Sequence, residues 1–396
     1  MMRRLFCQLA LVIGALALNV SCQGNSDPNQ LLTPEQLAVQ GVCYFGSDPI
    51  DESALDKRAT AGKLTVYTFI PPSQYETYLK DFSLRCPNIK INIHYEPPGP
   101  LTERLLKEQH TPKADVIWGI AATNLILMDW YDLLSPYSPA NIEHIKPEFR
   151  DSNKPPYWVG IDAWMVGLCV NPDLLKKLEL PFPIAWSDLV NPVYQDQIIL
   201  YNPYLTGTGF MMISHILQRH GEVDGWAYLD ALHRNIARYT QSDEEACALV
   251  AAGKKPIGIS YALAGIELKA QGEPIEPVFP VGLSGWDMEA NALVKKDHIK
   301  PAAKTFLDWT LSKTAMHAYA KNYAIIARND VDVPIPKGYP QEPAKQLFDR
   351  DFLWDAANRQ RILETLKERY GDKASLEAVA KIRLRPKPEP DFCNSF

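Results

Sequence analysis

From residue 63 the chain alternates between short apolar runs and amphipathic segments with a helical repeat. The runs are bounded by turn residues, and the segments between them space their apolar residues three or four positions apart. The expected strands are 64–69, 89–95, 114–119, 159–171, 197–200, 256–260 and 275–294. The expected helices are 71–85, 101–110, 121–134, 173–178, 223–232, 243–251, 300–311 and 313–321, with another after residue 209. This alternation predicts parallel sheets with helices on both faces.

The apolar run 159–171 divides this pattern into two α/β blocks. It is long enough to pass from one lobe to another, and the run 275–294 leads back. We therefore expect the following units: a first lobe of residues 63–160 and 285–373, a second lobe of 161–284, a polar tether of 23–62 and a tail of 374–396. Two lobes joined by more than one strand enclose a hinged cleft that can close around a ligand.

The segment 197–221 contains a short apolar strand, a loop with Thr206, Gly207, Thr208 and Gly209, and then a helix. Glycines let backbone N–H groups approach an anion, threonine hydroxyls can donate to it, and a helix amino terminus adds partial positive charge. The alternative is an ordinary helix cap, where Thr and Gly are common. The segment therefore predicts an anion-binding loop, with a cap as the alternative.

Polar and aromatic residues also collect where the other predicted strands end. Ligands of such sheets bind beyond the carboxyl ends of the strands, so these residues are candidate ligand contacts. Carboxylates beside an aromatic wall suit an ammonium group, and hydroxyls with backbone amides suit a tetrahedral oxyanion. The candidates are Thr68, Ala122, Thr123, Asp162, Trp164, Ser242, Tyr261, Trp286, Asp287 and Glu289. Each has a structural alternative, such as a strand-end cap for Asp162 or a core position for Trp164.

Composition narrows the class of function. The chain has 396 residues, 46% of them hydrophobic, and a net charge of −6. It is therefore globular, long enough for two lobes, and without a basic stretch for nucleic acid. The sequence contains neither a nucleotide-binding loop motif nor a zinc-binding helix motif. Residues 258–262 come near the G-x-S-x-G nucleophile elbow, but they end in alanine where that motif has glycine. We expect no catalysis, no cofactor and no resident metal; the alternative from another class is an exported α/β hydrolase or transferase.

Residues 1–22 predict export. Arg3 and Arg4 precede an apolar run of signal-peptide length that is short for a membrane span. Residues 18–22 resemble a bacterial lipoprotein cleavage box, which would make Cys22 the lipidated first residue of the mature chain. Residues 15–17 offer a competing cut between small residues. We expect a protein of the periplasm or cell envelope, anchored by lipid at Cys22.

The remaining cysteines predict a disulfide. None of the chain's 7 cysteines forms a C-x-x-C pair. Cys169 and Cys247 fall in the same predicted lobe, and an oxidising compartment permits a bond between them. The alternative is that both are small buried hydrophobic residues.

Several long stretches resemble the extracellular solute-binding proteins of ABC transporters, and more narrowly the group that binds 2-aminoethylphosphonate, which is related to ferric-ion-binding proteins. They extend from about residue 63 to residue 370 and read ADVIWGIAATNLILMD, WVGIDAWMVGLCVN, WSDLVNPVYQDQIILYNP, GTGF, GWAYLDALHRNIARYT, PIGIS, GWDMEANALVKK and YAKNYAIIA. The resemblance implies a two-lobed α/β periplasmic-binding-protein fold, type II-like, with a hinged interlobe cleft. It also implies an anion loop at 206–209 and cleft aspartates at Asp162 and Asp287.

The resemblance further implies a monomeric receptor that captures a small phosphonate or zwitterion and presents it to a membrane permease. Three other ligands are possible for a protein with this fold: a ferric ion, another small oxyanion or a polyamine. Ferric sites of this type usually use adjacent tyrosines, and the chain has no Tyr-Tyr pair. Leu205 replaces the usual small hydroxylated residue, and residues 241–245 are more acidic than the family's pattern. The ligand class therefore stays open within the family.

Overall fold

The structure is a computed structural model that describes residues 33, 36–37, 43–45, 61–204, 207–282, 284–371 and 373, without the side chains of 207, 208, 243 and 244. The predicted signal sequence with Cys22, most of the tether, Thr206 and the tail from residue 374 lie outside the described residues. Within the described part of the chain, no helix has both the length and the apolar character needed to cross a membrane.

The first lobe is built on a sheet in the order β2–β1–β3–β10–β5. Its parallel strands are β1 (Gly62–Thr68), β2 (Ile89–Tyr95) and β3 (Val116–Ala121), and β10 (Trp286–Val294) runs antiparallel to β3. The short strands β4 (Leu134–Ser135) and β11 (Ile325–Ile326) pair with β10 and β5. The helices of this lobe are α2 (Pro72–Arg85), α3 (Pro98–Lys107), α4 (Ala122–Trp130), α9 (Pro301–Thr310) and α10 (Lys313–Tyr319). The alternating pattern predicts the parallel arrangement of β1, β2 and β3, whereas the hinge strands β5 and β10 make the sheet mixed.

The second lobe repeats this plan on the order β5–β8–β6–β7. Its strands are β6 (Ile198–Tyr201), β7 (Ile236–Thr240), β8 (Ile257–Tyr261) and the short β9 (Glu276–Val278). Its helices are α5 (Pro172–Lys177), α6 (Gly207–Asn235), α7 (Asp243–Ala251) and α8 (Ala262–Ala270). Single 3-10 turns complete the two lobes at Ile142–His144, Pro147–Phe149, Trp186–Val190, Pro192–Tyr194 and Pro343–Gln346.

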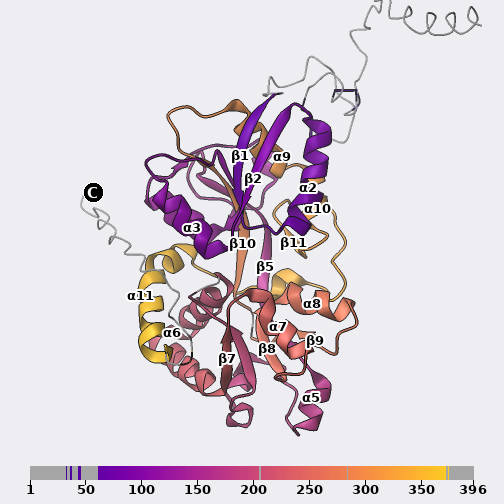
Figure 1. Cartoon of the computed structure of the whole chain (residues 1–396), viewed down its shortest axis with the longest axis vertical. Coiled ribbons are helices and arrows are strands. Elements are labelled where there is room, and N and C mark those ends of the chain that lie inside the picture. Colours follow the sequence, from indigo (N-terminus) through magenta and orange to yellow (C-terminus); the bar gives the residue numbers. More distant parts are fainter. Residues whose placement is uncertain are drawn as a thin grey trace, which may run out of the picture.

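Strand β5 (Trp158–Val170) belongs to both lobes. Its first half pairs with β10, its second half pairs with β8, and all 13 of its residues are buried. Figure 1 shows β5 and β10 running between the upper and lower lobes. Two separate hydrophobic cores lie on either side, one around Trp118 and Trp309 and the other around Tyr201 and Phe210. The expected passage of 159–171 between lobes is therefore how β5 runs.

The chain crosses between the lobes a third time, near its end. Residues 327–351 lead from the first lobe to α11 (Phe352–Tyr370), whose Ile362, Leu366 and Tyr370 pack in the second core. The sequence assigned all of 285–373 to the first lobe. Asp351 caps α11 by accepting the N–H of Trp354 at 2.8 Å, and the helix lies against both α4 and α6. Figure 1 shows α11 beside α6 at the junction.

Besides the two-residue strands β4 and β11 and the 3-10 turns, three elements were not expected from the pattern. The strand β7 is a short edge strand, α8 opens with an apolar turn that has no amphipathic repeat, and α11 carries many charges. The two helices expected after residue 209 form one element with a break at Gly221, where φ is 75°. The run 275–294 contains β9 and β10 rather than one strand.

Two disulfides are present among the described residues. Cys169 is bonded to Cys247, the pair expected from the sequence, with 5.4 Å between their Cα atoms. Cys43 is bonded to Cys86 at the end of α2, which was not expected. The second bond fixes one point of the tether to the first lobe.

Candidate ligand site

Two carboxylates face each other where the hinge strands meet. Asp162 on β5 pairs in register with Glu289 on β10, and the two residues are 0% and 2% exposed. Neither carboxylate oxygen of Asp162 has a hydrogen-bond partner among the described residues, and neither does Oε2 of Glu289. The hydroxyl of Tyr323 donates to Oε1 of Glu289 at 2.9 Å. We call Asp162 and Glu289 the hinge acid pair.

The hinge acid pair is short of positive charge. Burial raises the pKa of Asp162 well above its usual range, and the charge of Glu289 adds to the rise. Burial also raises the pKa of Glu289 to about 8. The polar neighbours are tyrosines, whose own pKa values are raised by burial and further by this pair: Tyr78, Tyr319, Tyr323 and Tyr339. Neutral hydroxyls cannot balance a buried carboxylate, so the pair holds a proton at neutral pH unless a cation arrives.

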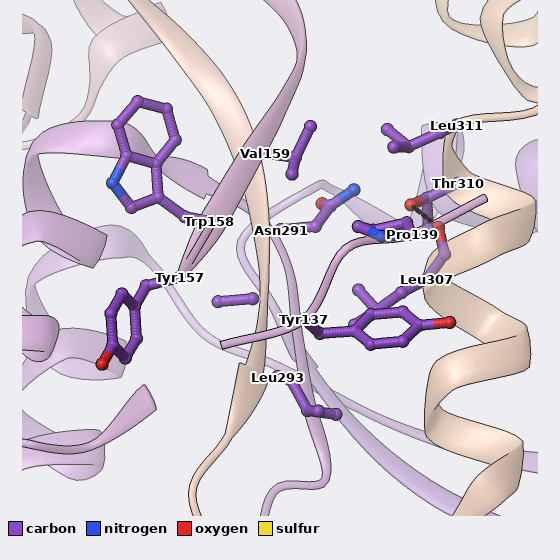
Figure 2. Close-up of a pocket in the computed structure, with 11 residues that line it drawn as sticks. Tyr137, Pro139, Tyr157, Trp158, Val159, Asn291, Leu293, Leu307, Thr310 and Leu311 are labelled. Atoms are coloured by element: carbon purple, nitrogen blue, oxygen red, sulfur yellow. Dashed lines mark hydrogen bonds between the residues drawn. The ribbon is translucent and has the colours of Figure 1, made fainter. Parts of the chain in front are cut away.

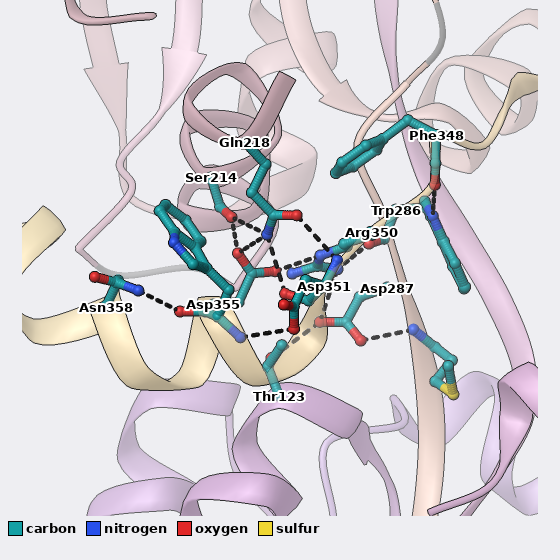
Figure 3. Close-up of polar contacts among 12 residues, drawn as sticks. Thr123, Ser214, Gln218, Trp286, Asp287, Phe348, Arg350, Asp351, Asp355 and Asn358 are labelled. Carbon is teal, nitrogen blue, oxygen red and sulfur yellow. Dashed lines mark hydrogen bonds and ion pairs between the residues drawn. The ribbon is translucent and has the colours of Figure 1, made fainter. Parts of the chain in front are cut away.

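A second cluster begins two residues earlier on β10, at Asp287, which pairs in register with Trp164. Thr123, in the first turn of α4, donates to Oδ2 of Asp287 at 2.9 Å, and Nη1 of Arg350 lies 3.4 Å from the same oxygen. Arg350 also donates to the carbonyl oxygen of Trp286 and forms an ion pair with Asp355 of α11. Figure 3 shows this arginine between the two carboxylates.

The same cluster reaches the second lobe. From α6, Gln218 donates to Oδ1 of Asp355 at 2.6 Å, and the hydroxyl of Ser214 donates to that oxygen as well. Burial raises the pKa of Asp287 and of Asp355, and the charge of Arg350 offsets part of each rise. We call these residues the arginine network: Thr123, Ser214, Gln218, Asp287, Arg350 and Asp355 (Figure 3). It joins α4 of the first lobe to α6 of the second.

Other predicted contacts have structural partners. The Thr68 hydroxyl accepts the N–H of Ile70 at 3.0 Å, which fixes the loop after β1. The indole N–H of Trp286 donates to the carbonyl oxygen of Phe348 at 2.9 Å, and its ring packs edge-on against Phe352. Trp286 thus lies in the first core, and Trp164 lies in the second.

The remaining candidates lie at helix starts. Ala122 begins α4 and is buried, Ser242 precedes α7 and is exposed, and Tyr261 precedes α8 and is half-buried. Ala121 pairs with Glu289 of β10 and Tyr261 pairs with Val166 of β5, so α4 and α8 begin beside the hinge strands, as expected for a sheet whose ligands bind beyond the strand ends.

The predicted anion loop is described only from Gly207, where α6 begins. A Cβ atom added at Gly209 would lie 2.6 Å from Cα of Pro203 and 3.0 Å from the ring of Tyr201. Glycine is needed there because the helix start packs directly on the end of β6. The hydroxyls of Thr206 and Thr208 lie outside the description, so the anion loop stays a prediction.

Sequence reasoning missed the residues that the C-terminal segment contributes, namely Arg350, Asp355 and Arg359. A signal was available, because Asp355 and Arg359 are four positions apart and share a face of α11 with the buried Ile362 and Leu366. Charged residues on the buried face of a helix usually have an ion-pair partner or a functional role.

Two cavities elsewhere in the described structure are poor candidates for the ligand site. The cavity in Figure 2 lies in the first lobe between Tyr137, Val159, Asn291 and Leu307, and its volume is about 10 Å³. That is room for about one water molecule. A groove of about 630 Å³ opens beside α4, but carboxylates dominate its lining, and only two arginines oppose them: Asp129, Glu148, Asp151, Asp349 and Asp351 against Arg150 and Arg350. The first is too small for a solute and the second is unsuited to an anion.

Comparison with known proteins identifies the family. A family model for bacterial extracellular solute-binding proteins matches residues 127–348, more than half of the chain. The chain belongs to this family. Its members bind solutes and are not enzymes, and they act outside the cytoplasmic membrane, in agreement with the export expected from residues 1–22.

Two curated proteins are similar to this chain. A probable ABC transporter periplasmic-binding protein of Sinorhizobium fredii is 26% identical over 281 residues, which is 65% of this chain and 72% of that protein. A phosphoglycerate transport regulatory protein of Salmonella typhimurium is 34% identical over 183 residues, 45% of this chain and 44% of that protein.

Solved structures confirm the two-lobed fold. The periplasmic binding protein AfuA of Actinobacillus pleuropneumoniae, solved with fructose-6-phosphate, matches with a TM-score of 0.71 and 25% identity, over 78% of this chain and 99% of that one. Iron-bound HitA of Pseudomonas aeruginosa matches with a TM-score of 0.67 and 19% identity, over 78% and 99%. The second likeness concerns the fold alone.

Proposed function

We propose that this chain is the solute receptor of an ABC importer and captures a small zwitterion that carries a phosphonate or phosphate group. The observation that carries the proposal is the hinge acid pair, which is buried and has no cationic partner among the described residues. An ammonium group is the simplest partner for it, since it brings both positive charge and hydrogen-bond donors. 2-Aminoethylphosphonate is a small solute with both ends.

Ionising Glu289 at pH 7 costs less free energy than a buried ammonium partner supplies. Glu289, with a pKa of about 8, is mostly protonated at pH 7, and one pKa unit corresponds to about 1.4 kcal/mol. A charge-assisted hydrogen bond in a buried site contributes about 1.5–3 kcal/mol. Binding of an ammonium group therefore expels a proton and still yields affinity.

The buried position of the pair supports capture by lobe movement. A solute reaches Asp162 and Glu289 only when the lobes separate about the crossing strands, and its contacts then favour the closed state. The closed form is the form that a permease would recognise. A receptor needs this difference between its empty and loaded states in order to signal occupancy.

The anionic end of the ligand is supported by the amino terminus of α6, where the sequence predicts the anion loop. The relatives support the same class, because one is named for phosphoglycerate and one was solved with fructose-6-phosphate. We propose no lipid or nucleic-acid ligand. The lipid anchor at Cys22 is part of the proposal and is tested by the intact mass of the membrane-bound protein.

A sugar phosphate is the second candidate, favoured by the protonated state of the hinge acid pair in the empty protein. Neutral carboxyls can exchange hydrogen bonds with hydroxyl groups, and no ionisation is then needed. A ferric ion has less support. No group of three His, Cys, Asp or Glu side chains that could hold a metal occurs in the described residues, and the tyrosines near the pair resist ionisation.

A thermal-shift screen of the mature chain with matched ligands tests the proposal. The pairs are 2-aminoethylphosphonate with ethylphosphonate and phosphoethanolamine with glycerol phosphate, and fructose-6-phosphate, ferric citrate and spermidine are included. A ligand at 100 times its Kd adds about 2.7 kcal/mol to the unfolding free energy. We expect the aminated member of each pair to give the larger shift. Equal shifts within pairs would favour the sugar phosphate, and a shift from iron or spermidine alone would overturn the proposal.

A further inference from the structure

The helix α11 lies outside the part of the chain that the family model matches, which ends at residue 348. It contacts α4 of the first lobe and α6 of the second, so one of its faces is turned toward the junction of the lobes. The buried residues Asp355, Ala356, Ile362 and Leu366 define that face. Arg359 lies on the same face, four positions after Asp355 and three before Ile362.

The guanidinium of Arg359 is held at the start of α6. Its Cζ atom lies 4.4 Å from the centre of the Phe210 ring, and Phe210 is the fourth residue of α6. The side chain of Arg359 is half-buried, and desolvation lowers the pKa of Arg359 to about 10. It therefore remains charged at neutral pH.

Arg359 differs from the other arginines of α11 in having no carboxylate partner in the described structure. Arg361 forms an ion pair with Glu222, and Arg369 forms one with Asp230 at 2.9 Å. The carboxylates whose negative charges act on Arg359 are Asp287 and Asp355, and both already have partners within the arginine network. A desolvated cation with no partner is costly unless an anion completes the site.

We propose that Arg359 binds the anionic group of the solute, together with the amino terminus of α6. A planar guanidinium offers paired donors to a phosphonate or phosphate, and the first backbone N–H groups of a helix of this length offer more. The ring of Phe210 holds the guanidinium flat without consuming its donors. This inference rests on the proposed function and names the residue that selects a doubly charged group over a carboxylate.

The position of α11 gives this residue a second consequence. Ion pairs and hydrogen bonds tie α11 to Gln218, Glu222 and Asp230 of α6, and Arg359 stacks on Phe210 of the same helix, so its guanidinium lies on the second-lobe side of the junction. The hinge acid pair lies where β10 pairs with the first half of β5, which is the part of β5 that belongs to the first-lobe sheet. A zwitterion held at both points would bridge the two, which is the contact that favours closure.

The test compares Arg359→Gln, Arg359→Lys and the control Arg361→Gln in the full mature chain. Binding of 2-aminoethylphosphonate, inorganic phosphate and β-alanine is measured by calorimetry, and the melting temperature of each empty variant is recorded. β-Alanine replaces the phosphonate with a carboxylate and keeps the ammonium group. We expect Arg359→Gln to weaken 2-aminoethylphosphonate about 30-fold or more and to remove the preference over β-alanine, while Arg361→Gln stays within about twofold.

Arg359→Lys should fall between the two, because it keeps the charge and loses the planar fork. The empty Arg359→Gln protein should melt no lower than wild type, since an unpaired desolvated cation is removed. Unchanged phosphonate binding, or a lower melting temperature with an unchanged preference over β-alanine, would overturn the inference and leave the proposed function standing. If the wild-type protein bound no phosphonate and no phosphate, both the inference and the proposed function would be overturned.

Discussion

Two carboxylates on β10 lie two residues apart and have opposite surroundings. Asp287 meets Arg350 and the hydroxyl of Thr123, while the polar partners of Glu289 in the described part of the chain are the hydroxyl of Tyr323 and the acid opposite it. Both are buried to the same degree, so burial does not separate them. The difference is the presence of a cation supplied by the chain. Asp287, which is paired with Arg350, links residues of the two lobes, whereas Glu289 remains available to a ligand cation.

The largest effect is expected from removing Arg350, the cation beside Asp287. Arg350→Met leaves Asp287 and Asp355 buried without a counter-charge, which should lower the unfolding free energy by about 3–5 kcal/mol at neutral pH. The loss should shrink at pH 5, where the two acids can take up protons. Urea denaturation at both pH values measures it.

The matched control is Arg361→Met on the exposed side of α11. Arg361 is 48% exposed and pairs with Glu222, so its loss should cost less than about 1 kcal/mol. Equal losses in the two variants would show that the arginine network is no stronger than a surface ion pair.

An intermediate effect is expected from pH acting on the hinge acid pair. The pKa of Glu289 is about 8 in the folded protein and 4.5 unfolded, so the folded state holds an extra proton between these values. This contribution to stability is complete below pH 4.5 and is lost as the pH rises through 8. Glu289→Gln should remove it and make the empty protein more stable than wild type at pH 8, by about 1–3 kcal/mol.

Thermal melts of the empty protein from pH 5 to pH 9 measure this dependence. Glu342→Gln, at an exposed carboxylate that pairs with Lys345, is the control and should follow wild type. A Glu289→Gln variant with the same pH profile as wild type would mean that Glu289 is already ionised, and the contrast with Asp287 would disappear.

The smallest effect concerns the first-lobe end of the arginine network. Thr123→Val keeps the shape of the side chain and removes the hydrogen bond to Asp287, which should cost about 1 kcal/mol. Ser242→Ala, at an exposed position, should change the unfolding free energy by less than about 0.5 kcal/mol. If Thr123→Val abolished ligand binding at unchanged stability, Thr123 would belong to the ligand site rather than to the network.

The strands and their roles were predictable from local pattern. Residues 159–170 are apolar throughout except at Asp162, which indicates a buried strand, and β5 is buried along its whole length. The alternation of strands and helices sufficed for the parallel strands of each lobe, but it did not predict that β10 and β5 run antiparallel to their neighbours. Cys169 and Cys247 could be paired because they fall in one lobe, whereas the partner of Cys86 lies in the polar tether, where no pattern marks a contact.

The candidate site was predictable only in part, because partners distant in sequence are not visible to periodicity. Asp162 and Glu289 could be named as polar residues in apolar strands, but their register, which makes them a pair, depends on the strand order. Asp287 looked equivalent to Glu289 until Arg350, 63 positions later, appeared beside it. The ligand role of the loop at 206–209 stays a prediction.

The measurement that tests the central claim most directly is the proton count on ligand binding. Calorimetry at pH 7 in two buffers of different ionisation enthalpy gives this count for the aminated ligand with the largest thermal shift and for its deaminated analogue. We expect the aminated ligand to release about one more proton than its analogue, from the hinge acid pair, and Glu289→Gln to abolish the difference. Equal proton release for the two ligands, or a difference that survives in Glu289→Gln, would contradict the assignment of the pair as the cation-binding half of the site.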